Sequence, residues 1–202
     1  MFAKPTYKFE NRLYKQGYKN IAGLDEVGRG AWAGPVVAAA VILPPKLKIK
    51  GIRDSKLLSP KQREALYIYI NKKALGVAVG IISEKIIDSQ GIIVATRMAF
   101  LKAIKNLKID VDYLLVDGWK IFEHEKPTDF LIKGDNKIVS VAAASIIAKV
   151  TRDHILMDYH QQYPHYNFAK HKGYGTKEHR ELLYQHGLSK IHRSSWQPMV
   201  GF

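Results

Sequence analysis

The 202-residue sequence contains no cysteine. Disulfide bonds, thiolate zinc sites, iron–sulfur clusters and a cysteine nucleophile are therefore excluded, and the expected location is a reducing cytoplasm. Long apolar runs are also absent: the longest, residues 31–43, contains Gly34 and Pro35 and is shorter than the ~20 residues of a membrane span. Residues 1–17 carry several charged side chains and no apolar stretch, so no signal peptide is expected.

Acidic residues are scarce relative to basic ones. The 18 Asp and Glu residues face 32 Lys and Arg residues, which leaves a net charge of +14 and a pI near 9.8. A basic excess of this size points to a polyanionic partner, most often a nucleic acid. Apolar residues still make up 47% of the chain, which is typical of a folded globular protein and argues against disorder.

Several catalytic signatures are missing as well. The sequence has no H-E-x-x-H zinc-protease motif, no G-x-S-x-G nucleophile elbow and no Walker A loop. The spacing of Gly28, Gly30 and Gly34 does not match the G-x-G-x-x-G motif of a dinucleotide site. These absences disfavour zinc proteases, serine-dependent α/β-hydrolases, P-loop nucleotide-binding proteins and dinucleotide-binding proteins.

The apolar pattern predicts an α/β protein, and the length favours one domain over residues 1–202. The expected strands lie at residues 21–25, 36–43, 75–82, 113–116 and 130–132. The expected helices lie at residues 7–17, 60–73, 91–107, 138–159 and 176–186, the second of them preceded by a capping box at Ser59 and Gln62. The alternation of strands and helices implies a sheet that is at least partly parallel. Residues from about 160 to 202 are expected to form a basic helical C-terminal extension.

Asp25 and Glu26 stand next to each other at the end of an apolar strand. Buried carboxylates repel each other and lose hydration, so such a pair needs a cation. Mg²⁺ and Mn²⁺ prefer oxygen ligands and would supply it. Adjacent strand residues point to opposite faces, so both side chains reach one site only if the strand ends or bends there, which Gly28 and Gly30 permit. The alternative is a solvated Asp-Glu pair in a turn.

Three further acids lie near apolar segments. Asp117 ends a strand, where open α/β sheets form their sites, although a simple Asp-Gly turn is the alternative. Asp135 precedes the long helix, where an aspartate is otherwise a routine N-cap. Asp153 lies inside that helix, where an ion pair with Arg152 or Lys149 is the alternative. Acids from two strand ends and a helix start would satisfy a two-metal nuclease.

Two segments could hold a nucleic acid closely. Gly28-Arg29-Gly30 offers backbone N–H groups and one guanidinium, although a tight turn explains it as well. Tyr174 lies between two glycines and could stack on a base or sugar, with ordinary packing as the alternative.

Basic loops supply further candidates. Ser55 and Lys56 lie in a polar loop and could contact a phosphate, with a solvated loop as the alternative. A basic tail could follow a nucleic-acid backbone. Its members are Lys170, Lys172, Lys177, Arg180, Lys190 and Arg193.

Taken together, these segments resemble ribonuclease HII, the type 2 ribonuclease H family. The matching stretches occur in the family's order over most of the chain, and the set is highly specific. They are residues 23–41 (GLDEVGRGAWAGPVVAAAV), 54–63 (DSKLLSPKQR), 115–118 (LVDG), 133–153 (KGDNKIVSVAAASIIAKVTRD) and 171–179 (HKGYGTKEH).

The resemblance implies a ribonuclease H-like fold, with a mixed five-stranded sheet flanked by helices and a helical C-terminal segment. It implies endonucleolytic hydrolysis of RNA in RNA–DNA hybrids. It also implies incision 5′ to a single ribonucleotide in duplex DNA, which leaves 3′-hydroxyl and 5′-phosphate ends. Two Mn²⁺ or Mg²⁺ ions are the expected cofactors, nucleic acid is the expected partner, and a monomer is the default expectation.

The family's functional residues also map onto this chain. By resemblance, the metal-binding and catalytic acids are Asp25, Glu26, Asp117 and Asp135, and Asp153 has a supporting role. The Gly-Arg-Gly segment matches the family's backbone clamp around the 2′-hydroxyl, and Tyr174 matches the tyrosine that stacks on the next deoxyribose. The expected substrate-binding residues are Gly28, Arg29, Gly30, Ser55, Lys56 and Tyr174.

Two other functions stay open on the residues alone. A non-catalytic nucleic-acid-binding protein explains the net charge of +14 but not the acids at strand ends. A different metal-dependent nuclease of the same fold would lack a preference for the ribonucleotide junction. The combination of the Gly-Arg-Gly segment with Tyr174 argues against the second alternative.

Overall fold

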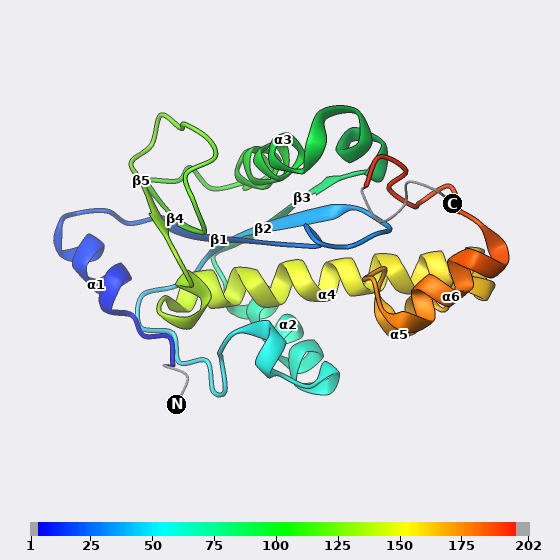
Figure 1. Ribbon diagram of the computed structural model, residues 1–202. Helices are drawn as coiled ribbons and strands as arrows, with labels where there is room; N and C mark the ends of the chain where they lie inside the picture. The colour runs from blue at the N-terminus through cyan, green and yellow to red at the C-terminus, as the bar shows by residue number, and fades with distance from the viewer. Residues whose placement is uncertain (1–3, 197–202) are drawn as a thin grey trace.

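Five strands form one mixed sheet at the centre of the molecule (Figure 1). A computed structural model describes residues 4–196 of the chain. The strands are β1 (Ile21–Val27), β2 (Val36–Ile42), β3 (Gly76–Ile82), β4 (Tyr113–Asp117) and β5 (Thr128–Leu131), in the order β3-β2-β1-β4-β5. Neighbours among β1, β2 and β3 are antiparallel, whereas β4 is parallel to both β1 and β5. The predicted five-stranded mixed sheet is confirmed.

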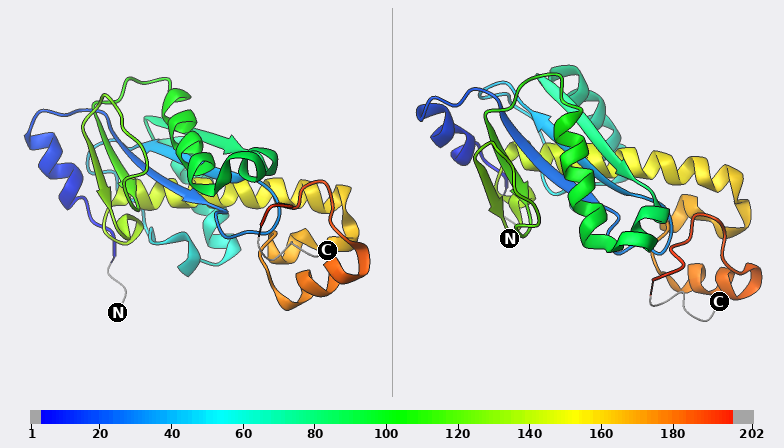
Figure 2. Two further views of the ribbon diagram at one scale, coloured as in Figure 1. Left: turned by 45° about the horizontal axis from the view of Figure 1, so that its top comes forward. Right: turned by 90° about the horizontal axis from the view of Figure 1, so that it is seen from above.

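Helices cover both faces of this sheet (Figures 1 and 2). They are α1 (Lys8–Lys15), α2 (Pro60–Lys73), α3 (Glu84–Lys105), α4 (Val139–Gln162), α5 (Phe168–His171) and α6 (Lys177–His186). Three 3₁₀ turns lie in the connections: η1 (Ser55–Leu57) before α2, η2 (Gly134–Asn136) before α4 and η3 (Pro164–Tyr166) before α5. None of the helices within residues 4–196 is both long and apolar enough to span a membrane.

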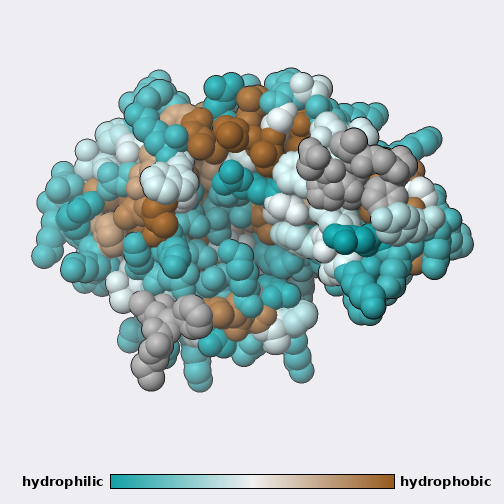
Figure 3. Space-filling model, in the orientation of Figure 1, coloured by the Kyte–Doolittle hydropathy of each residue, from teal (hydrophilic) through white to brown (hydrophobic). Residues whose placement is uncertain are grey.

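The sheet separates two apolar layers. On one face Leu24 and Ala38 pack with α3, and on the other Val37 and Ala39 pack with α4 and α2. Because both faces are buried, the strands read as almost continuous apolar runs rather than alternating ones. Figure 3 shows a mostly hydrophilic surface on one side of the molecule, with hydrophobic residues gathered over α3.

Glycine permits the close contact between α4 and the central strand. A Cβ atom added to Gly23 on β1 would overlap the backbone of Ser140 and Val141 in α4. Gly80 on β3 has the same role on the other face, where a Cβ atom would overlap the carbonyl of Ala99 in α3. The helices therefore lie directly against the strand backbones.

A carboxylate from α1 stabilises the start of α4. The buried Glu10 accepts hydrogen bonds at Oε1 from the backbone N–H (2.9 Å) and the hydroxyl (3.0 Å) of Ser140. An acid at a helix N-terminus satisfies free N–H groups and interacts favourably with the helix dipole. This contact fixes the first turn of α4, which directly follows η2.

The predicted elements agree with the structure except at particular boundaries. The capping box of α2 is present, with Ser59 Oγ accepting from Gln62 N–H at 3.3 Å and Gln62 Oε1 accepting from Ser59 N–H at 2.9 Å. β1 continues to Val27, beyond the expected end at Asp25. α3 begins at Glu84 rather than at Gly91, because Gly91 (φ 81°, ψ 162°) divides two helical pieces and the sequence pattern detected only the second.

The segment after α4 packs at the far end of that helix (Figure 2). Its apolar residues form a separate cluster that includes Phe168 and Leu183. Leu156 from α4 and Trp32 from the β1–β2 loop complete the cluster. The C-terminal segment is therefore attached both to α4 and to the loop after β1; residues 197–202 lie outside the described part.

The Gly23→Ala variant is expected to destabilise the fold by about 1–3 kcal/mol, because the added methyl group must displace the α4 backbone. The matched control is Gly76→Ala on β3, where the nearest atom to an added Cβ is a flexible Leu107 methyl at 3.3 Å. Urea unfolding of both variants measures the difference. Equal losses of unfolding free energy in the two variants would contradict the close contact.

Candidate active site

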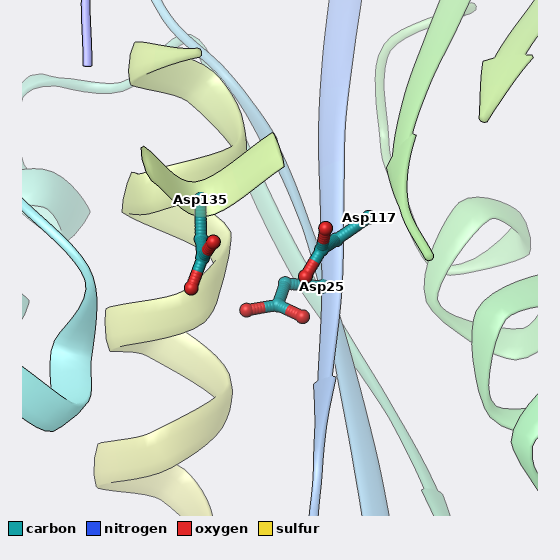
Figure 4. Close-up of side chains that lie close together, drawn as sticks. All are labelled: Asp25, Asp117 and Asp135. Atoms are coloured by element: carbon teal, nitrogen blue, oxygen red, sulfur yellow. The ribbon is translucent and has the colours of Figure 1, made fainter. Parts of the chain in front are cut away.

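Three aspartates lie close together near the carboxyl ends of β1 and β4 (Figure 4). Asp25 lies on β1, Asp117 is the last residue of β4, and Asp135 lies in η2 just before α4. Because β1 and β4 are parallel neighbours, their carboxyl ends come together, as at the sites of other open α/β sheets. One carboxylate oxygen from each aspartate lies within 4.8 Å of the other two.

These carboxylates are costly to ionise together. Burial raises the pKa of Asp25 well above its ordinary value, and the charges of Glu26 and Asp117 raise it further. Burial also raises the pKa values of Asp117 and Asp135. A hydrogen bond from the backbone N–H of Gly134 to Asp117 Oδ1 (2.7 Å) acts in the opposite direction. Buried, mutually repelling oxygen ligands at this spacing fit a hard divalent cation.

Glu26 does not join this cluster of three. β1 continues past it, and its carboxylate forms an ion pair with Arg29 at 3.2 Å. Its pKa is nevertheless raised by burial and by the charge of Asp117, while Arg29 lowers it. The expected end of the strand at Asp25 is therefore wrong, and Glu26 pairs with Arg29 while its charge still acts on Asp25.

The structure separates Asp135 from Asp153. Asp135 belongs to the cluster and does not cap α4, whose N-cap is Ile138. Asp153 instead forms an ion pair with Lys149 at 2.7 Å. The N-cap alternative is excluded for Asp135, and the ion-pair alternative is correct for Asp153.

The loop at η1 lies beside the acids. The buried Ser55 hydroxyl lies 3.0 Å from the hydroxyl of Ser145, which in turn lowers the pKa of Asp25 by hydrogen bonding. Burial lowers the pKa of Lys56, but the nearby carboxylates of Asp54 and Asp25 outweigh it, so that the pKa is raised. Lys56 thus interacts electrostatically with the cluster, and Ser55 is connected to it through Ser145, a residue that sequence reasoning missed.

A buried arginine holds the loop that follows β1. Arg193 donates to the carbonyl oxygens of Gly28 (2.6 Å), Arg29 (2.9 Å) and Gly34 (2.9 and 3.1 Å). Its side chain is fully buried, and burial lowers its pKa to about 9. The prediction that Arg193 belongs to a basic tail that follows a nucleic-acid backbone is wrong, because its buried guanidinium is bound to backbone carbonyls of the loop after β1.

A second buried arginine holds the other side of the same loop. Arg152 on α4 donates to the carbonyl oxygens of Ala33 (2.9 Å), Pro35 (2.9 Å) and Lys172 (2.8 Å). Its guanidinium carbon lies 5.3 Å from the centre of the Tyr174 ring. Sequence reasoning missed this role. The available signal was an arginine within a largely apolar helix, and the structure shows that its side chain is fully buried.

Tyr174 lies beside the Gly-Arg-Gly segment despite the distance in sequence. Its backbone forms an antiparallel bridge with Ala31, and the N–H of Trp32 donates to the carbonyl of Gly173 at 2.8 Å. The structure therefore brings the glycine loop and the tyrosine together at the end of the strand that carries Asp25.

Comparisons with known proteins agree with this geometry. The family model described as "Ribonuclease HII" matches residues 22–199. The chain belongs to the ribonuclease HII family. Ribonuclease HII from Acetivibrio thermocellus is 52% identical over 93% of this chain and 73% of the relative, and that from Chloroflexus aurantiacus is 46% identical over 97% and 95%.

Solved structures give the same assignment. Ribonuclease H2 from Pyrococcus horikoshii has a TM-score of 0.76 at 29% identity and covers 90% of this chain and 95% of its own. Ribonuclease HII in the PCNA complex from Archaeoglobus fulgidus has a TM-score of 0.76 at 26% identity, with 89% and 96% covered. As a member of the ribonuclease HII family, the protein is a metal-dependent endoribonuclease that acts on RNA–DNA hybrids.

In this ribonuclease HII chain, paired histidines fix the backbone at Tyr174. His192 Nδ1 accepts from the Ser189 N–H (2.8 Å), so its neutral ring carries the proton on Nε2 and donates it to His179 Nε2 (3.0 Å). His179 Nδ1–H then donates to the Tyr174 carbonyl (2.9 Å). Burial lowers the pKa of His179 to about 3 and that of His192 to about 4.

This arrangement predicts acid sensitivity. Between about pH 6.5 and pH 4, His192 binds a proton in the unfolded chain but stays neutral in the folded protein. The free energy of unfolding therefore decreases as the pH falls through this range. The His192→Asn variant keeps an acceptor for Ser189 but does not titrate. Urea unfolding at several pH values is therefore expected to show a gap between wild type and variant that narrows over this range. A gap independent of pH would contradict the buried neutral pair.

Proposed function

We propose that this protein hydrolyses the RNA strand of RNA–DNA hybrids and also incises 5′ to a single ribonucleotide embedded in duplex DNA. The products would carry 3′-hydroxyl and 5′-phosphate ends. The observation that carries the proposal is the continuity of the site: β1 leads from Asp25 directly into the Gly28 loop, and that loop pairs with Tyr174 through Ala31. Reaction centre and sugar-reading groups are thus joined through a few residues of backbone.

The glycine loop suits recognition of a 2′-hydroxyl. Gly28 has φ +93°, and an added Cβ there would overlap the Arg152 guanidinium. At Gly30, no atom lies within 4 Å of an added Cβ, which leaves open space for a substrate to approach the backbone. The 2′-hydroxyl distinguishes RNA from DNA and can both donate and accept hydrogen bonds. A rigid loop with one open glycine can therefore read this single group.

Tyr174 suits recognition of the following deoxyribose. Its ring lies 5.3 Å from the Arg152 guanidinium and 6.0 Å from the Lys149 ammonium, so cations fix its orientation. A sugar without a 2′-hydroxyl can approach an aromatic face closely. The step from ribonucleotide to deoxyribonucleotide would then be read by two adjacent elements.

The acids suit two divalent ions, either Mn²⁺ or Mg²⁺. We infer that Asp25, Asp117 and Asp135 hold them, with Glu26 as the fourth ligand once its ion pair with Arg29 is released. When bound, such ions activate a water for in-line attack and stabilise the departing 3′-oxygen. Lys56 is close enough to the acids to attract the scissile phosphate, and Ser55 holds the loop that carries it.

Replacement of one acid tests the catalytic assignment. In Asp117→Asn the amide oxygen can still accept from the Gly134 N–H, so the fold and duplex binding should persist. Cleavage of a DNA duplex with one ribonucleotide should fall by more than the roughly 10- to 100-fold that removal of an outer ligand partner costs. The measurement is single-turnover cleavage of the labelled duplex with Mn²⁺, Mg²⁺ or EDTA, with the cut mapped to the nucleotide.

Asp110→Asn is the matched control, because Asp110 is 82% exposed and pairs with Lys126 on the surface. Wild-type rates are expected for this variant. A wild-type rate in Asp117→Asn would remove Asp117 from the active site. Tight binding without any metal-dependent cut would favour a non-catalytic nucleic-acid-binding protein.

Tyr174 provides a separate prediction about specificity. Loss of a stacked ring costs about 1–3 kcal/mol, so Tyr174→Ala should reduce kcat/KM at the junction about tenfold or more. Tyr174→Phe should retain most of the activity because it keeps the ring. Binding of an all-DNA duplex, measured by fluorescence anisotropy, should change less than junction cleavage. Equal losses in both assays would indicate a purely structural tyrosine and an enzyme without junction preference.

A further inference from the structure

A hollow of about 550 Å³ lies beside Tyr174, whose side chain forms part of its wall. Three other segments line it: the start of α2 with Arg63, the middle of α4 with Lys149 and Asp153, and the turn after α5 with Lys172. None of the three clustered aspartates belongs to this wall. The hollow therefore adjoins the proposed sugar-stacking ring without being part of the acid cluster.

Positive charge exceeds negative charge in this hollow. Lys149 forms an ion pair with Asp153 at 2.7 Å, and Arg63 donates to the carbonyls of Ser55 (3.0 Å) and Leu58 (2.6 Å). Among the ion pairs within residues 4–196, none involves Lys172 or Arg63.

The pKa of Lys172 reflects this excess. Burial lowers it first, and the like charges of Lys149 and Arg63 lower it further, while Asp153 acts in the opposite direction. Like charges held together in a partly buried wall are stabilised by an anion that reaches all of them. The backbone of a nucleic acid supplies one such charge per nucleotide.

We propose that this hollow is a phosphate-binding site for the DNA that continues on the 3′ side of the ribonucleotide. Lys149 and Lys172 are the binding residues, and Arg63 adds positive charge while it holds the η1 loop. The inference rests on the proposed function, because Tyr174 sets which strand and which direction enter the hollow. The Lys149 ammonium lies 6.0 Å from the centre of that ring, so it is within reach of a phosphate next to a sugar stacked there.

The test combines protein variants with neutral phosphates. Junction duplexes carry a methylphosphonate at one of the first four phosphates on the 3′ side of the ribonucleotide. Affinity is measured by anisotropy in EDTA for wild type and for the Lys149→Gln, Lys172→Gln and double variants. In wild type, a methylphosphonate at one or two of these positions should weaken duplex binding about tenfold. In the double variant, the same substitutions should change the affinity little.

A salt series provides an independent measure. For each phosphate that a variant no longer neutralises, the slope of log affinity against log salt concentration should decrease by about 0.9. The control is Lys105→Gln with Lys108→Gln, which removes two charges from the α3 side of the molecule. This control should keep the wild-type sensitivity to each neutral phosphate. Thermal unfolding of every variant checks the fold, since the Lys172 carbonyl also accepts from Arg152.

The results separate this inference from the proposed function. Equal sensitivity of wild type and both single variants to every neutral phosphate would overturn the phosphate site, even if the junction is cut normally. Should the wild type fail to incise the unmodified junction while the variants still abolish the phosphate effect, the proposed function fails and the binding site stands. Lys149→Gln alone keeps the test decisive if the Lys172 variants unfold.

Discussion

Direct contact between α4 and β1, which Gly23 permits, is the constraint on which the site depends. A helix held against the strand backbone delivers a series of side chains to fixed places along it. Its approach places Asp135 near Asp25, its second turn brings Ser145 to the same acid, and further along Arg152 reaches under the loop after β1. One packing contact thus aligns the acid cluster with the groups proposed to read the sugar.

Charge in this fold is divided between two incomplete sites. The acids near Asp25 have raised pKa values because burial and mutual repulsion disfavour their ionised forms. In the hollow, positive charge is in excess, and burial together with the charges of Lys149 and Arg63 lowers the pKa of Lys172. A metal ion would relieve the repulsion at the first site, and the proposed phosphate contact would relieve it at the second. The net charge of +14 is therefore unevenly distributed, and each site is complementary to a different part of one catalytic complex.

The sequence predicted the parts of this structure that depend on local pattern. The end of β4 marked Asp117, whereas β1 ends two residues after the expected position at Asp25. The resemblance distinguished Asp135 from Asp153, and only Asp135 lies in the cluster. The ion pair of Glu26 with Arg29 could not be predicted, because it depends on where β1 ends and how the chain turns after it. Arg193 was wrongly assigned to the basic tail, because its carbonyl partners lie about 160 residues away in the sequence and no local pattern indicates them.

The proposed reading elements are held from behind by the protein's own backbone. Arg193 and Arg152 bind carbonyls of the glycine loop, and His179 binds the carbonyl of Tyr174. Their positions therefore do not wait for substrate, so binding energy is not spent on ordering them. The acids differ, because burial and mutual repulsion keep their pKa values raised even with Lys56 and the Gly134 N–H beside them. An enzyme built this way can select a sugar with a rigid surface and still make cleavage depend on metal, which keeps recognition and hydrolysis as separable properties of adjoining residues.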